Sequence, residues 1–211
     1  MPIIRRKLQI ANGVSFHLMW QCHNKDSFLE DERVKVKYFK LLKKNSEEYG
    51  VQIHAYNFMS THPHILGTIS EVDAFIRFMQ TVNSGLGKFI NRKLGRLGQA
   101  IRDRYKIVPI HDNRHQMTAL IYIDMNPVRA GIVNHPRDYK WSSYRLYGEG
   151  VPNPLISPAP AYLALGNSDE DRRKRYGELI NIFLEKEKCL QSLRNLEKPY
   201  PNDQEIALEW S

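Results

Sequence analysis

The sequence of 211 residues contains few cysteines, no long apolar run and fewer acidic than basic side chains. Cys22 and Cys189 are too far apart in the chain to form a metal-binding motif, so we expect two reduced thiols in a cytoplasmic protein. No apolar stretch approaches the roughly 20 residues that a membrane-spanning helix needs. No apolar segment follows the basic start at Arg5, Arg6 and Lys7, so neither a signal peptide nor a membrane partner is expected.

The excess of basic residues lies in one part of the chain. The formal net charge is +8, but residues 1–148 hold 23 Lys and Arg against 12 Asp and Glu, whereas residues 149–211 hold 8 against 11. A basic surface favours a polyanionic partner, and nucleic acid is the commonest one. A generic soluble basic protein is the alternative that charge alone leaves open.

Hydrophobic periodicity predicts a mixed fold. Strands are expected over 14–20, 51–59, 62–69 and 104–110, and helices over 31–49, from an N-cap at Ser70 onward, and from about Asn113 to a point before Pro127. The last helix should stop there because the residue before a proline disfavours helix. The interleaved order, without regular βα repetition, indicates an α+β fold with a largely antiparallel sheet covered by helices.

The composition changes after about Gly148. Two proline-rich stretches, Val151-Pro-Asn-Pro and Ser157-Pro-Ala-Pro, predict a connector, and a charged helix is expected from about Ser168 to Leu196. We therefore expect one domain over residues 1–148 and a connector with a helical C-terminal extension over residues 149–211.

The segment His62-Pro63-His64 is the first candidate for chemistry. Residues two apart in an extended segment point to the same face, so both imidazoles would project together while Pro63 points into the core. Tyr122 and Asn126 are four apart in a predicted helix and also share a face. These side chains supply imidazole and amide-oxygen metal ligands and one phenolic nucleophile, a set that suits metal-assisted attack on a phosphodiester.

A divalent metal ion would complete this set. Nitrogen ligands from His62 and His64, an oxygen from Asn126 and open positions suit Mg²⁺ or Mn²⁺ holding a phosphate. A free phenol has a pKa of about 10, so Tyr122 needs a polarised phosphate and a nearby base or water. The product would be a phosphotyrosine and a free hydroxyl, which permits rejoining to a second strand.

Each of these residues also has a structural interpretation. His62 and His64 can be half-buried histidines with satisfied hydrogen bonds, and Asn126 can be a helix-terminal residue before proline. Tyr122 can be an aromatic residue packed on the sheet, because apolar neighbours surround it in the sequence.

Several segments resemble the REP-associated tyrosine transposases, a group of IS200-like, single-tyrosine HUH transposases. They are the HUH-like run 55–64, the run 122–133 that is similar to the catalytic helix, the following run 138–144, and the shorter matches Gly13-Val14, Cys22-His23-Asn24 and Arg104-Tyr105-Lys106. The resemblance covers about residues 1–148 and continues more loosely through Leu165-Gly166.

The resemblance implies a ferredoxin-like α+β domain. It implies that His62 and His64 are metal ligands, that Tyr122 is the nucleophile and that Asn126 is a polar metal ligand. It also implies cleavage of single-stranded DNA beside short hairpins, through a 5′-phosphotyrosine and a free 3′-OH. Pro63 departs from the bulky apolar residue usual between the histidines, and it removes one sheet N–H donor.

Basic side chains are expected to follow the DNA backbone. The candidates are Arg5, Arg6, Lys88, Arg92, Lys93, Arg102 and Arg104. The partner is single-stranded or hairpin DNA, and a homodimer is a further assembly that the sequence allows. Two other functions stay open: a DNA-binding protein of the same fold with impaired catalysis, and a metal-dependent phosphodiesterase in which Tyr122 is structural.

Overall fold

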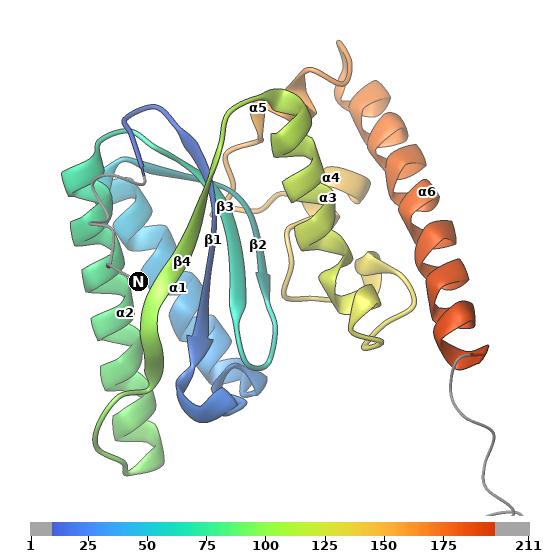
Figure 1. Ribbon diagram of the computed structural model, residues 1–211. Coiled ribbons are helices and arrows are strands. Elements are labelled where there is room, and N and C mark those ends of the chain that lie inside the picture. Colours follow the sequence, from blue (N-terminus) through green and yellow to red (C-terminus); the bar gives the residue numbers. More distant parts are fainter. Residues whose placement is uncertain (1–9, 197–211) are drawn as a thin grey trace, which may run out of the picture.

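The computed structural model of the chain describes residues 10–196 (Figure 1). Arg5 and Arg6, two predicted DNA contacts, lie outside the described residues, and so does the side chain of Arg104. The core of the fold is an antiparallel sheet of four strands in the order β2-β3-β1-β4. The strands are β1 (Ser15–Cys22), β2 (Val51–Phe58), β3 (Pro63–Ile69) and β4 (Ile101–Ile110).

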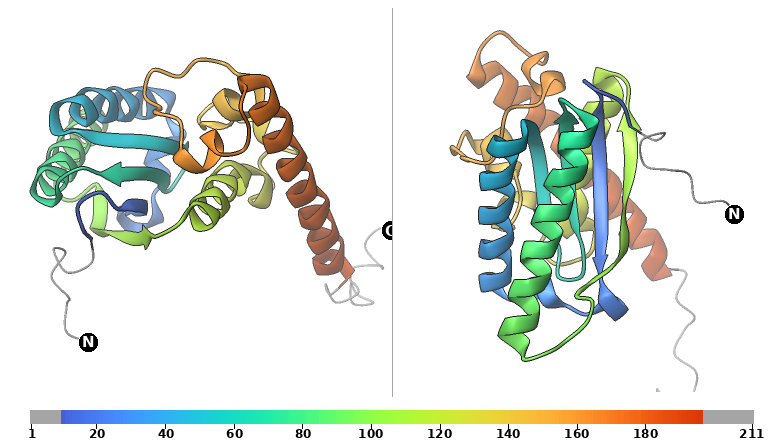
Figure 2. Two further views of the ribbon diagram at one scale, coloured as in Figure 1. Left: turned by 90° about the horizontal axis from the view of Figure 1, so that it is seen from above. Right: turned by 90° about the vertical axis from the view of Figure 1, so that its left-hand side faces the viewer.

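Two long helices connect these strands, α1 (Glu32–Tyr49) between β1 and β2, and α2 (Val72–Leu94) between β3 and β4. The resulting β-α-β-β-α-β order with this strand arrangement is ferredoxin-like, so the predicted fold class is confirmed. Both helices cover one face of the sheet (Figure 2). Short 3-10 turns at His23–Lys25 and Phe28–Glu30 lead from β1 into α1.

The strand β1 shows how the sequence divides the two faces of the sheet. Phe16, Leu18, Trp20 and Cys22 are buried and pack with α1 and α2, while the residues between them are only half-buried. Side chains alternate between faces along a strand, so this pattern aims His17 at the opposite face. That opposite face is the one on which the candidate site lies.

The ends of the two long helices test the predicted boundaries. The helix α1 begins after Asp31, whose carboxylate accepts the N–H of Arg33, and it ends at Tyr49 before a left-handed Gly50, which agrees with the predicted range 31–49. The expected cap at Ser70 was wrong. Glu71 caps α2 instead by accepting two backbone N–H groups, while the Ser70 hydroxyl donates to the carbonyl of Gly50.

The helix α3 (Asn113–Arg129) lies on the other face of the sheet and carries Tyr122. The prediction that it stops before Pro127 was wrong, because the helix continues through that proline. Proline has no N–H to donate to the carbonyl of Ile123, four residues earlier. The side-chain amide of Asn57 on β2 donates to this carbonyl instead, at 2.9 Å. The carbonyl of Ile123 therefore has a hydrogen-bond donor from outside the helix.

The C-terminal segment forms a second core with α3. It contains a 3-10 turn (Pro136–Asp138) and the helices α4 (Tyr144–Glu149), α5 (Pro160–Leu163) and α6 (Asp169–Leu196). Apolar side chains of α6, including Tyr176, Ile180 and Leu184, are buried in the same cluster as Leu120 and Ile123 of α3. The helices α5 and α6 are therefore packed on α3.

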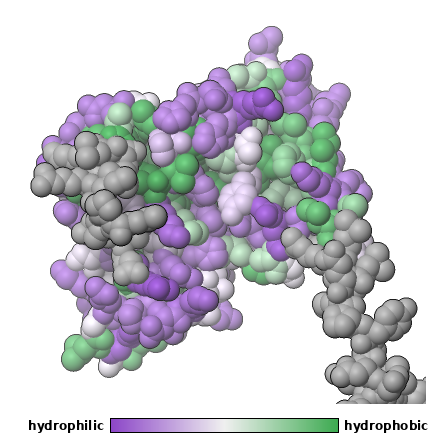
Figure 3. Space-filling view, in the orientation of Figure 1, coloured by the Kyte–Doolittle hydropathy of each residue, from purple (hydrophilic) through white to green (hydrophobic). Residues whose placement is uncertain are grey.

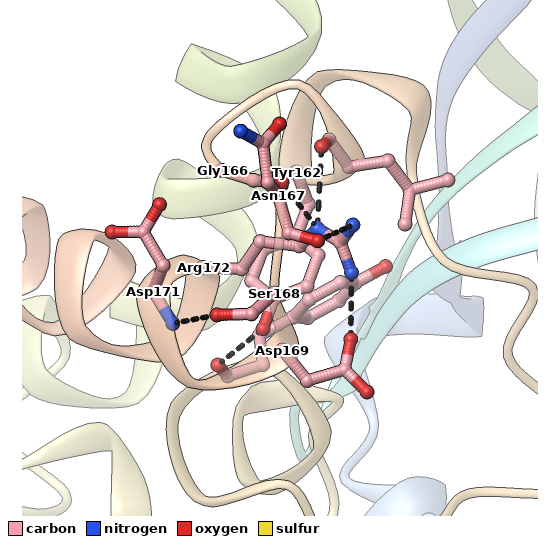
Figure 4. Close-up of polar contacts among 9 residues, drawn as sticks. Tyr162, Gly166, Asn167, Ser168, Asp169, Asp171 and Arg172 are labelled. Atoms are coloured by element: carbon pink, nitrogen blue, oxygen red, sulfur yellow. Dashed lines mark hydrogen bonds and ion pairs between the residues drawn. The ribbon is translucent and has the colours of Figure 1, made fainter.

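The start of α6 is held by a network of hydrogen bonds around Arg172 (Figure 4). Its guanidinium donates to the carbonyl of Gly166 at 2.8 Å and pairs with Asp169 at 2.6 Å. Ser168 caps the helix by accepting the N–H of Asp171, which agrees with the predicted start. These contacts fix the direction in which α6 leaves the turn and runs along α3.

None of the helices within residues 10–196 is long and apolar enough to cross a membrane.

Candidate active site

Two histidines from neighbouring strands form the centre of the site. In the antiparallel register of β1 and β3, Met19 pairs with His64 and His17 pairs with Leu66. His17 and His64 are therefore diagonal neighbours on the face of the sheet that faces α3. Their rings lie 5.2 Å apart between centroids, and Nε2 of His17 is 3.0 Å from Nδ1 of His64.

His64 is buried, and its environment favours the neutral imidazole. Burial, with smaller contributions from His17 and His62, lowers the pKa of His64 to about 3. Burial, with a contribution from His115, also lowers the pKa of His17 to about 4. The other ring nitrogen of His64, Nε2, is buried and has no hydrogen-bond partner. A metal ligand requires a neutral imidazole with an available nitrogen, and Nε2 of His64 offers one.

His62 lies beside His64, directly before β3. The two rings meet edge to face with their centroids 4.9 Å apart, so the two imidazoles lie next to each other. Nδ1 of His62 is 2.9 Å from the hydroxyl of Thr61, and burial lowers the pKa of His62. Pro63 is buried and is the first residue of β3, a strand position that tolerates the missing N–H.

Tyr122 of α3 meets this histidine pair from across the sheet face. Its ring centroid lies 5.7 Å from that of His64 and 5.8 Å from that of His17. The side chain of Tyr122 stays 38% exposed, so a substrate can reach it. The guanidinium of Arg129, two turns along the same helix, lies over the Tyr122 ring at 5.0 Å.

Asn126 lies one turn after Tyr122 and is half-buried. Its side-chain amide donates to the carbonyl of Tyr122 at 2.9 Å, which leaves Oδ1 as an acceptor. The structure thus brings Tyr122 together with His64, which His62 contacts in turn, and it holds the Asn126 amide against the backbone of the same helix.

A hollow of about 400 Å³ opens beside Tyr122 between the sheet and α3. Its lining is partly apolar, and it also contains Lys106 and His115. Lys106 pairs with Met19 across β1 and β4, so its exposed amine lies on the same face as His17. This hollow borders the ring of Tyr122 and the imidazoles of His17 and His64.

The predicted DNA-contacting residues divide between the two faces of the sheet. Lys88, Arg92 and Lys93 belong to α2, across the sheet from Tyr122, and the amine of Lys93 is ion-paired with Asp31. Arg102 pairs with Gln21 on β1 and lies on the face of the site. Their role in binding DNA stays a prediction, and the structure does not bring the α2 residues to the nucleophile.

The residues that could bind a divalent metal ion at this site are few. Among the described residues there is no group of three or more His, Cys, Asp or Glu that could enclose a metal ion. His62, His64 and the amide oxygen of Asn126 would have to share the ion with water and a substrate phosphate, which is how Mg²⁺ and Mn²⁺ are commonly bound. The unpartnered Nε2 of His64 is the observation that fits such an ion.

Three features of the site escaped the sequence reasoning. His17 is the partner of His64, Arg129 covers the Tyr122 ring, and Lys106 lines the hollow. The seven-residue spacing of Tyr122 and Arg129 places both side chains on one face of the helix, so this contact could have been predicted from the sequence. His17 and Lys106 required the strand register, which a single sequence does not provide.

Comparisons with known proteins identify the family and the fold of this chain. The family model described as "Transposase IS200 like" matches residues 11–126, more than half of the chain. A solved structure of a REP-associated tyrosine transposase bound to a REP hairpin is similar with a TM-score of 0.60 and 19% sequence identity, covering 75% of this chain and 93% of that chain. A Deinococcus radiodurans crystal structure named as a transposase has a TM-score of 0.39 and 17% identity, over 58% of this chain and 96% of that one. No curated protein gives a significant match.

Proposed function

Because the chain belongs to the IS200-like transposase family, we propose that it binds hairpin-containing single-stranded DNA and cleaves and rejoins it through a phosphotyrosine at Tyr122. The observation that carries the proposal is the meeting of the exposed Tyr122 ring with His17 and His64, whose buried Nε2 has no hydrogen-bond partner. The similar structure of a hairpin-bound transposase supports the choice of substrate.

In the proposed reaction the phenolic oxygen of Tyr122 bonds to the scissile phosphorus. The bond from phosphorus to the 3′ oxygen breaks, the phenolic proton passes to solvent, and the leaving 3′ oxygen takes up a proton. The 5′ phosphate stays on Tyr122, and a 3′-OH from a second strand can reverse the step. The bond energy is conserved in this way, which simple hydrolysis does not achieve.

The side chains around Tyr122 have distinct proposed roles. Arg129 lies over the ring and would stabilise negative charge on the phenolic oxygen as attack begins. Lys106 would attract the phosphate into the hollow. His62, His64 and Asn126 would hold Mg²⁺ or Mn²⁺, which when bound would polarise the scissile phosphate and orient it.

The hydrogen bond between His17 and His64 supports the metal-ligand assignment. In the tautomer where Nδ1–H of His64 donates to Nε2 of His17, the lone pair of His64 Nε2 is free for an ion. Histidine ligands commonly donate their second nitrogen in this manner, which fixes both tautomer and ring orientation.

The test is a denaturing-gel assay with labelled hairpin DNA from the region flanking the gene, in Mn²⁺ or Mg²⁺. We expect a protein–DNA adduct with the wild type and none with Tyr122→Phe. We also expect His62→Ala and His64→Ala to abolish cleavage while hairpin binding persists. Binding of the hairpin without an adduct in either metal would favour the catalytically impaired alternative. Cleavage that survives Tyr122→Phe would favour a metal-dependent phosphodiesterase.

A further inference from the structure

A second hollow, of about 250 Å³, lies on the other side of Tyr122, between α3 and α6. Thr118 and Tyr122 line both hollows, so the nucleophile stands at the boundary between them. Apolar side chains gather where α3 and α6 meet (Figure 3), and Arg129, Lys186 and Glu187 are the charged residues of the lining. The remaining lining residues are Ile121, Met125, Arg129, Phe183, Lys186, Glu187 and Leu190.

The chemistry of this hollow matches one nucleotide better than it matches a peptide or a lipid. The ring of Phe183 is 37% exposed on α6 and faces the hollow that Tyr122 borders from α3. Exposed aromatic rings are the usual platforms on which single-stranded bases stack. The amine of Lys186 supplies a cation for the backbone, and the volume exceeds that of one nucleobase.

The C-terminal extension also anchors the residue that covers the nucleophile. Glu187 of α6 is buried, and its Oε2 lies 3.8 Å from Nε of Arg129. Arg129 in turn lies over the Tyr122 ring. The α6 helix therefore contributes both to the wall of this hollow and to the position of the group beside the reacting phenol.

We infer that the hollow between α3 and α6 binds the base of the nucleotide whose 5′ phosphate becomes attached to Tyr122, stacked on Phe183. This rests on the proposed function. Once the other fragment has left, this nucleotide is the one bonded directly to Tyr122, so its base is within reach of the two hollows that Tyr122 borders. The first hollow, with His64 and Lys106, holds the phosphate, so the base is directed to the second hollow.

The experiment varies the DNA and the protein together. An abasic residue replaces either the tethered nucleotide or the one before the cleavage point, and the rate of adduct formation is measured under single-turnover conditions. With wild-type protein, removing the tethered base should slow the adduct on the order of tenfold, as loss of one stacked base implies. In Phe183→Ala this sensitivity should disappear, because the stacking partner is already absent, and Phe183→Trp should restore it.

Ile182→Ala is the matched control. Ile182 is the neighbouring residue on α6, is 64% exposed and does not line the hollow, so its removal should leave the base sensitivity at the wild-type level. A second readout does not need cleavage. In the Tyr122→Phe background, 2-aminopurine at the tethered position should be quenched on binding, and Phe183→Ala should remove the quenching.

The outcomes separate this inference from the proposed function. If adducts form but the tethered base has no influence, or if the sensitivity lies at the preceding nucleotide, the base site between α3 and α6 is disproved and Tyr122 cleavage stands. If Phe183→Ala keeps the wild-type sensitivity, the stacking assignment is disproved. If the wild type forms no adduct with any hairpin, the proposed function fails and this inference fails with it.

Discussion

The hydroxyl of Tyr176 on α6 donates to the carboxylate of Asp124 on α3 at 2.7 Å, in a fully buried environment. The hydroxyl of Ser143 donates to the other oxygen of the same carboxylate at 2.9 Å. Asp124 lies between Tyr122 and Asn126 in sequence but faces the second core. A single buried carboxyl thus connects the helix of the nucleophile to the C-terminal extension.

This carboxyl should make stability depend on pH. Burial raises the pKa of Asp124 from 3.8 to about 7, although Tyr176 and Ser143 partly oppose the shift. Between these values the folded protein keeps a proton that the unfolded chain has released, so stability falls as pH rises through this window. The cost is absent below about pH 4 and fully present above about pH 7, with a slope of at most about 1.4 kcal/mol per pH unit.

The comparison is between the wild type and Asp124→Asn, unfolded by urea from about pH 5 to about pH 8. The amide cannot ionise, so the variant should lose most of the pH dependence in this range. Burial raises the pKa of Tyr56, Tyr144, Tyr147 and Tyr176 nearby, so they stay neutral throughout. Equal slopes for the two proteins would show that Asp124 is not the titrating group.

The hydrogen bond from Asn57 to the carbonyl of Ile123 predicts a coupling with Pro127. Asn57→Leu should destabilise the fold by about 1–3 kcal/mol, because it leaves a buried carbonyl without a donor. The same change in a Pro127→Ala background should cost less, since alanine restores the N–H that proline lacks. A double-mutant cycle of unfolding free energies measures the difference, expected at about 1 kcal/mol.

Asn45 offers a matched control for this cycle. It is also buried, and its side-chain amide donates to the carbonyl of Leu41 in α1, away from the site. Asn45→Leu should destabilise the protein to the same extent with and without Pro127→Ala. A coupling as large as that of Asn57 would mean that the effect is not specific to the Ile123 carbonyl.

His17 should control metal affinity without being a ligand. His17→Phe keeps a ring in place but removes the nitrogen that contacts His64 Nδ1. Loss of such a partner commonly weakens metal binding by about 10–100-fold. Mn²⁺ affinity can be measured by electron paramagnetic resonance of the free ion, with His115→Phe as a control from the same hollow. Unchanged Mn²⁺ affinity in His17→Phe would rule out this orienting role.

The division of basic residues between two faces predicts an uneven response to salt. Lys106 lies on the face of Tyr122, so Lys106→Gln should lower the slope of log affinity against log salt by about one. Lys88→Gln, on α2 behind the sheet, should leave the slope for the hairpin unchanged. A larger decrease of this slope for Lys88→Gln than for Lys106→Gln would indicate that the DNA binds on the face covered by α1 and α2.

Local pattern was sufficient for much of the fold. The strand and helix periods indicated the interleaved elements and the bounds of α1, because these depend on a few neighbouring residues. Reasoning from neighbouring residues was wrong at two points. The Ser70 hydroxyl donates to the carbonyl of Gly50 and does not cap α2, and α3 continues through Pro127. In the second case the decisive donor, Asn57, is 66 residues away from the carbonyl it serves.

The periodicity of strand and helix predicts that His62 and His64 project to one side, and that Tyr122 and Asn126 share a helix face. The residues that surround them follow from the three-dimensional packing. The register of β1 against β3 brings His17 to His64, and the packing of α6 brings Glu187 to Arg129. Such contacts join distant segments through burial and hydrogen bonding, and no local pattern carries information about them.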